Sequence, residues 1–316
     1  MTRNPRHITR LAPSPTGALH LGNARTFLIN WALARAGGWR VLLRIEDLDS
    51  PRVKPGAADQ ITDTLTWLGL DWDHGPTCQS HDLAPYRDAM RVLAERALVY
   101  PCSLTRTEVE RAASAPHADQ HETRFPEHLR PSIQPGTFAD ERTNWRFVVR
   151  EGDVGFADAF LGPQTHSPAQ TVGDFVVWTR RGQPSYQLAV VVDDHRQGVT
   201  QVVRGADLLD STARQLLLQR ALGLTPEPTY THLPLVVGPD GRRLAKRHGD
   251  TRIETYRDRG IPAGRIIAML ARWSGIEPDE TMTAHDFVQA LDLSTMSHDA
   301  VVFGSEDDRW LRARPS

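Results

Sequence analysis

The sequence predicts an α/β protein with a parallel sheet, an insertion and a small C-terminal helical unit. Residues 7–45 are interpreted as strand, loop, helix and strand, which is the opening of a parallel βαβ arrangement. The stretch 103–143 then changes character, because it is rich in His, Pro and charged residues and poor in large apolar ones. After Asp250 most of the remaining sequence has helical periodicity.

The individual elements follow from local patterns. Residues 7–12 (HITRLA) are expected to form a short strand, which a loop with two prolines and two glycines follows. Residues 23–36 have helical periodicity without a breaker, and the apolar run 41–45 is the next strand. The run YQLAVVVDD at 186–194 is interpreted as an apolar strand closed by acids. Further helices are expected at 57–70, 85–98, 211–222, 263–274 and 284–291, and further strands at 145–149 and 233–237.

Composition limits the function classes. The chain has 316 residues and a formal net charge of −2, so RNA contacts must come from local arginine clusters rather than from bulk attraction. Two cysteines argue against a disulfide framework. No apolar run reaches the roughly 18 residues of a membrane span, and the N-terminus lacks a signal-peptide pattern. A soluble cytoplasmic protein that does not enter the membrane is therefore expected.

Two distant segments are predicted to clamp one polyphosphate. The loop at 13–23 (PSPTGALHLGN) opens a helix, so backbone N–H groups and the positive helix end can face phosphate oxygens. His20 adds a donor to this loop, and Gly22 permits close approach of a ligand. The basic cluster at 243–247 (RLAKR) is the second clamp. Because ligands bind beyond the carboxyl ends of parallel strands, Ser14, His20 and Glu46 should lie together there.

These motifs resemble those of a known family. The segment 10–26 (RLAPSPTGALHLGNART) resembles the signature loop of class I glutamyl-tRNA synthetases. The segment 44–49 (RIEDLD) is similar to their second motif, and 186–200 together with 203–209 to a third. RLAKR at 243–247 occupies the place of their lysine-rich loop, and the resemblance extends over nearly the whole chain. It implies a class I synthetase-like Rossmann domain.

The resemblance implies that ATP activates L-glutamate to glutamyl-adenylate before transfer to RNA. Arg10 and Arg204 are the expected carboxylate partners, because a guanidinium fork matches that planar anion. Glu46, at a strand end, would take the ammonium group. The full glutamate pocket that the family match implies consists of Arg10, Leu11, Ala12, Pro13, Ser14, Glu46, Tyr186 and Arg204.

For ATP, which carries Mg²⁺, the resemblance implies a second set of residues. His20 and Lys246 are the expected catalytic residues, with Lys246 at the pyrophosphate. The loop departs from the family's KMSKS or KLSK pattern: Arg243 keeps the charge, but Ala245 removes a hydroxyl, which puts the rate in question. The expected ATP-binding residues are Thr16, His20, Gly22, Asn23, Arg243 and Lys246.

The acceptor is inferred from where the chain stops. Full-length members of the family continue into an anticodon-binding region, whereas this sequence stops at Ser316, so no such domain is expected. It is similar in this to the short glutamyl-Q tRNA(Asp) synthetases, which attach glutamate to the queuosine base in the anticodon of tRNA(Asp). Val190 stands where the full-length enzymes tend to carry Asn. The alternatives are an enzyme that charges tRNA(Glu) and a non-catalytic RNA-binding paralogue.

The resemblance also raises the question of zinc. The short group often holds a structural zinc through a CxC pair followed by Tyr and Cys. Cys102 is retained here, but Leu104 replaces the second cysteine. His117 and His121 are weak substitute ligands, because three spread residues fall short of a closed tetrahedral set. No metal site is therefore expected.

Four segments and a monomeric state complete the prediction. Residues 1–98 and 186–250 are the expected halves of the Rossmann domain. The insertion, 99–185, is expected to bind the acceptor, and 251–316 forms a helical unit similar to the family's stem-contacting region.

Overall fold

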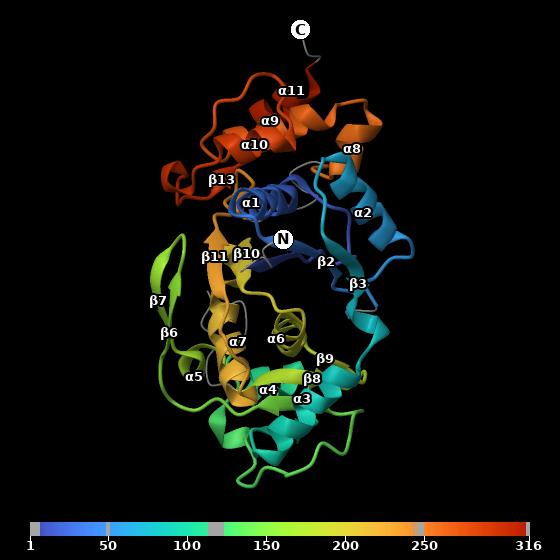
Figure 1. Ribbon diagram of the computed structural model, residues 1–316. Coiled ribbons are helices and arrows are strands. Elements are labelled where there is room, and N and C mark those ends of the chain that lie inside the picture. The colour runs from blue at the N-terminus through green and yellow to red at the C-terminus, as the bar shows by residue number, and fades with distance from the viewer. Residues whose placement is uncertain (1–6, 49–50, 113–122, 243, 245–249, 314–316) are drawn as a thin grey trace, which may run out of the picture.

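The computed structural model describes residues 7–48, 51–112, 123–242, 244 and 250–313. Figure 1 shows an elongated molecule with three tiers: the C-terminal helices, a central sheet region and the insertion at the opposite end. Within the described residues no helix is both long enough and apolar enough to cross a membrane.

The central tier contains the parallel sheet that the sequence predicts. Its first part has the order β1-β2-β3, and β10 pairs in parallel with β11. The backbone N–H of Thr200 donates to the carbonyl of Ile8 (2.9 Å), which places β1 beside β10. The bounds are β1 (Ile8–Leu11), β2 (Arg40–Ile45), β3 (His74–Cys78), β10 (Gln201–Gly205) and β11 (Thr229–Leu233).

A hairpin extends this sheet beyond β11. It consists of β6 (Val154–Asp158) and β7 (Gly162–His166), which pair with each other in antiparallel. Tyr230 of β11 pairs in parallel with Asp158 of β6. Residues 154–166 therefore lie inside the predicted insertion but join the central sheet.

The far tier is an antiparallel sheet with the order β4-β5-β8-β9. It packs with α3 (Ala84–Glu95) and α6 (Tyr186–Arg196) around a core of its own. This core is separate from the one between α1 (Leu21–Gly37), the first strands and the C-terminal helices. The bounds are β4 (Val99–Cys102), β5 (Asn144–Phe147), β8 (Phe175–Thr179), β9 (Gln183–Pro184), α4 (Arg106–Ala112) and α5 (Pro168–Thr171).

The remaining helices largely match the expected ones. The C-terminal unit is helical, as the sequence predicts, and the structure shows that it packs on α1. The bounds are α1 (Leu21–Gly37), α2 (Ala57–Trp67), α3 (Ala84–Glu95), α7 (Leu209–Leu222), α8 (Ile253–Asp258), α9 (Ala263–Arg272), α10 (Ala284–Ala290) and α11 (Ser305–Arg312). The short strands β12 (Val236–Val237) and β13 (Val301–Val302) pair in parallel, so the expected strand 233–237 is in fact the end of β11 and β12.

The expected strand at 186–194 is wrong, because the structure has a helix there, α6 (Tyr186–Arg196). Residues Leu188–Asp194 are all buried, so the segment has no polar face to reveal a helical period. Three consecutive valines favour a strand locally, but packing between α3, α7 and the insertion sheet overrides that preference.

Candidate active site

A cleft of about 470 Å³ lies where β1, β2 and β10 end. Most residues predicted for glutamate and ATP line it together. Leu11 does not: its side chain is fully buried in the core, because alternate residues of a strand point to opposite sides and Arg10 points into the cleft. The predicted residues that line the cleft are Arg10, Ala12, Pro13, Ser14, Thr16, His20, Gly22, Asn23, Glu46, Tyr186 and Arg204.

Asp194 of α6 organises one wall of this cleft. Its Oδ1 accepts from Arg10 Nε (3.2 Å) and pairs with Arg44 Nη1 (2.8 Å), and Arg44 Nη2 also contacts Glu46 Oε1 (3.1 Å). Burial by itself would raise the pKa of Asp194, but the charges of Arg10 and Arg44 outweigh it and lower that pKa. Burial raises the pKa of Glu46, which Arg44 and Arg10 oppose. Sequence analysis missed Arg44 and Asp194 as site residues because the contacts of Asp194 with Arg10 and Arg44 join residues that are distant in the chain.

Arg204 forms the opposite wall and has a different environment. Its Nε donates to His232 Nε2 (3.0 Å), Nη1 to Gln215 Oε1 (2.8 Å), and Nη2 to Thr212 Oγ1 (2.7 Å). These acceptors are uncharged, whereas Arg10 and Arg44 pair with a carboxylate. Arg204 is nevertheless only 5% exposed.

Among the described residues, Arg204 is a buried guanidinium of this cleft that contacts no carboxylate directly. Arg10 and Arg44 pair with Asp194, and Arg44 also contacts Glu46. A buried charge without a direct counter-ion is unfavourable, so this arrangement favours an anionic ligand at Arg204. The second carboxylate of an acidic amino acid is such a ligand.

His20 begins the phosphate side of the cleft as the N-cap of α1. Its Nδ1 accepts from the backbone N–H of Asn23 (3.4 Å), so in the neutral ring Nε2 carries the proton. A Cβ added at Gly22 would lie only 3.3 Å from the His20 ring. The lack of space beside His20 is therefore a reason for a glycine at this position, in addition to the close approach of a ligand. The positive end of a 17-residue helix thus faces the cleft.

The segment that follows the second predicted clamp lies beside the first clamp. The backbone N–H of Leu21 donates to the carbonyl of Thr251 (3.0 Å), and that of Ile253 to the carbonyl of Leu19 (2.9 Å). The chain that follows RLAKR therefore runs beside the loop of His20. Arg243 and Lys246 lie outside the described residues.

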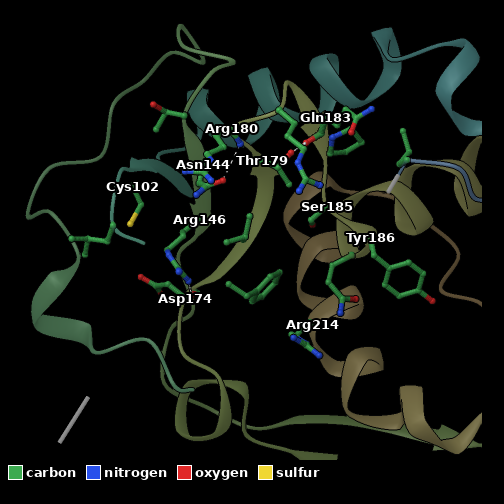
Figure 2. Close-up of a pocket in the computed structure, with 18 of the residues that line it drawn as sticks. Cys102, Asn144, Arg146, Asp174, Thr179, Arg180, Gln183, Ser185, Tyr186 and Arg214 are labelled. Carbon is green, nitrogen blue, oxygen red and sulfur yellow. Dashed lines mark hydrogen bonds between the residues drawn. The ribbon is translucent and has the colours of Figure 1, made fainter. Parts of the chain in front are cut away.

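A larger cleft of about 1020 Å³ opens on the first. The two clefts share Ser14, Glu46 and Tyr186. Figure 2 shows the second cleft between the insertion sheet and the helices that carry Tyr186 and Arg214. Five arginines line it, and of its two lining carboxylates Glu46 contacts Arg44 while Asp174 contacts Arg130 (2.6 Å). The five are Arg142, Arg146, Arg180, Arg181 and Arg214.

The described part of the insertion does not fit a zinc ion. Cys102 is buried in an apolar cluster, and Leu104 packs against that cluster where a second thiolate would be needed. No group of three or more potential ligands occurs among the described residues. His117 and His121 lie outside them.

Comparisons with known proteins agree with this geometry. Residues 7–310 match the family described as tRNA synthetases class I (E and Q), catalytic domain. The chain is 47% identical to a glutamyl-Q tRNA(Asp) synthetase of Rhodopirellula baltica over 86% of each chain. It is 44% identical to one of Symbiobacterium thermophilum, over 94% of this chain and 96% of the relative. A glutamate tRNA ligase from Elizabethkingia meningosepticum, solved in complex with its amino acid, matches with a TM-score of 0.80 and 26% identity. That match covers 97% of this chain and 68% of the other.

Proposed function

This chain belongs to the glutamyl-Q tRNA(Asp) synthetases within the class I tRNA synthetases, and on that premise we propose its reaction. It activates L-glutamate with ATP and transfers the glutamyl group to the queuosine base in the anticodon of tRNA(Asp). It is a ligase of the aminoacyl-tRNA synthetase type that acts as a cytoplasmic monomer with the four segments predicted above. The observation that carries the proposal is Arg204, a buried guanidinium in the cleft at the strand ends whose contacts within the described structure are all with uncharged groups, because such a cation suits a carboxylate of glutamate.

We infer the following roles in the first step. Arg204 and Arg10 hold carboxylate groups of glutamate, and Glu46 receives the ammonium group. An oxygen of the α-carboxylate attacks the α-phosphorus of ATP, and the bond to pyrophosphate breaks. His20 and Lys246 hold the phosphates, and the Mg²⁺ that accompanies ATP neutralises their charge. The protein contributes positioning and charge stabilisation rather than covalent chemistry.

The second step uses the larger cleft. A hydroxyl of the acceptor attacks the glutamyl carbonyl carbon, and AMP leaves with the bonding electron pair. The acceptor must reach Glu46 and Tyr186 from a side that glutamate leaves open, and the second cleft opens there. Its arginines suit the phosphates of an RNA loop.

The test is a glutamylation assay on tRNA(Asp) with and without queuosine. We expect labelled glutamate on the queuosine-containing tRNA alone. Glutamate on tRNA(Glu), independent of queuosine, would replace this proposal with the second candidate. That candidate has its own support, since the chain is 37% identical over 96% of its length to the glutamate–tRNA ligase 2 of Halorhodospira halophila. Absence of glutamate-dependent exchange of pyrophosphate into ATP would indicate a non-catalytic protein.

A further inference from the structure

Asp158, His232 and Arg204 form a buried hydrogen-bonded row across three neighbouring strands. Arg204 of β10 lies directly opposite His232 of β11, and β6, which ends at Asp158, runs on the other side of β11 (Figure 1). Asp158 Oδ2 lies 2.6 Å from His232 Nδ1, and Arg204 Nε lies 3.0 Å from His232 Nε2. The three residues are 4%, 0% and 5% exposed. Only Arg204 lines the cleft, so the other two lie behind it.

The row fixes the protonation state of His232. A guanidinium Nε can only donate, so the Nε2 of His232 must accept and carries no proton. The proton of the neutral ring is therefore on Nδ1, from which it donates to Asp158. Burial lowers the pKa of His232, and Arg204 lowers it further against the opposing effect of Asp158. His232 is thus a neutral acceptor for Arg204.

Asp158 is itself held by the backbone. Its carboxylate accepts from the N–H groups of Phe160 (3.0 Å), Leu161 (2.8 Å) and His232 (3.1 Å). Burial by itself would raise the pKa of Asp158, but the hydrogen bonds from His232 and these backbone groups lower it. The ionised carboxylate of Asp158 determines the orientation and tautomer of the His232 ring. Carboxylates that accept from metal-binding histidines have the same effect on those rings.

The neutral imidazole of His232 keeps the carboxylate of Asp158 from contacting the guanidinium of Arg204 directly. If Asp158 touched Arg204 directly, it would neutralise the guanidinium and compete with an incoming carboxylate. A neutral imidazole orients the guanidinium and leaves its charge available. Arg10 shows the other arrangement, because it contacts Asp194 directly.

We propose that Asp158 and His232 are positioning residues for glutamate recognition, which act by holding Arg204 oriented and without a direct counter-ion until the substrate carboxylate arrives. This rests on the proposed function, in that the carboxylate is that of glutamate. Neither residue touches the substrate, and nothing in the local sequence around either one marks it as part of the site.

The test compares Asp158→Asn with wild type in glutamate-dependent pyrophosphate exchange. The new amide can donate to His232 Nδ1, which moves the ring proton to Nε2, where it opposes the N–H of Arg204. We expect the KM for glutamate to rise about 10- to 100-fold, the range for a hydrogen bond to a charged group. The KM for ATP should remain within a factor of about two. Asp308→Asn is the control, because it removes a carboxylate that accepts from Tyr256 in the C-terminal unit.

A rescue variant separates positioning from general damage. In His232→Gln the side-chain oxygen can accept from Arg204 without a particular tautomer. Asp158→Asn should therefore raise the glutamate KM much less in the His232→Gln background than in wild type. Equal effects in both backgrounds, or parallel increases in the KM for glutamate and ATP, would overturn the proposal.

The tautomer can be measured in the unmodified protein, so the test does not depend on a variant that folds. Nitrogen-15 NMR of the histidine rings, with His232 assigned by its absence in His232→Gln, should show a proton on Nδ1 and none on Nε2 at pH 7. A proton on Nε2, or on both nitrogens, would show that His232 does not accept from Arg204, and the proposed hydrogen-bonded row would be wrong. Wild-type protein without any exchange activity would instead refute the proposed function, and the NMR result would still decide the row.

Discussion

The two adjoining clefts differ in the exposure of the arginines at their edges. In the smaller one, Arg10 and Arg204 are 4% and 5% exposed, and each donates to fixed partners in the protein. At the larger one, Arg142 and Arg180 are exposed. A small ligand with a defined shape benefits from preorganised donors, whereas a phosphate backbone needs mobile cations that adapt to it. This difference is the one expected if, as proposed above, the smaller cleft binds an amino acid and the larger one receives RNA.

The largest expected effect concerns the smaller cleft. Arg204→Ala should lower kcat/KM for glutamate in pyrophosphate exchange by about 10²- to 10⁴-fold, since breaking a buried charge pair, here the one with the substrate carboxylate, costs about 3–5 kcal/mol. Arg150→Ala is the matched control, because Arg150 is exposed and outside both cleft linings. If the Arg204→Ala variant exchanged pyrophosphate at a rate within about threefold of wild type, the proposed difference in role between the two clefts would be wrong.

Glu46→Gln tests the opposite charge in the same cleft. The substitution keeps the shape but removes the anion expected at the glutamate ammonium group. The KM for glutamate should increase about tenfold or more, because hydrogen bonds to charged groups contribute about 1.5–3 kcal/mol. Steady-state exchange with glutamate as the varied substrate measures this. An unchanged KM would assign the ammonium group to another residue.

Substitutions at the rim of the larger cleft should impair the transfer of glutamate to RNA but not the activation of glutamate by ATP. Arg142→Ala with Arg180→Ala should reduce tRNA glutamylation about tenfold at moderate salt while pyrophosphate exchange stays at the wild-type rate. Each lost phosphate contact should also reduce the salt dependence of RNA binding by roughly one unit of slope. Arg150→Ala again serves as the control. An unchanged salt dependence in a filter-binding titration would contradict RNA binding at this rim.

The smallest expected effect comes from metal removal. Because Leu104 fills the apolar cluster around Cys102, dialysis against a zinc chelator should leave the melting temperature within about one degree. Elemental analysis of protein purified without a histidine tag should give far less than one zinc per chain. Stoichiometric zinc, lost together with stability on chelation, would show that His117 and His121 complete a site.

Sequence reasoning succeeded where the relevant information is contiguous. The strand, the loop and the helix that His20 caps are encoded within 30 residues, so it could be predicted that Ser14, His20 and Glu46 lie together in one cleft. It failed for α6, because a segment that is buried all round has no amphipathic period.

The sequence by itself determined the parallel α/β fold, and it indicated the loop and the arginines that we propose bind phosphate and carboxylate. Only the tertiary structure decided how those arginines are held. Asp194 meets Arg10 across 184 residues, and Asp158 meets His232 across 74. Such pairs depend on strand register and helix packing, which place residues side by side regardless of their separation in the chain. Local periodicity carries no record of those contacts, and so the charge that Arg204 keeps available could be recognised only in the folded protein.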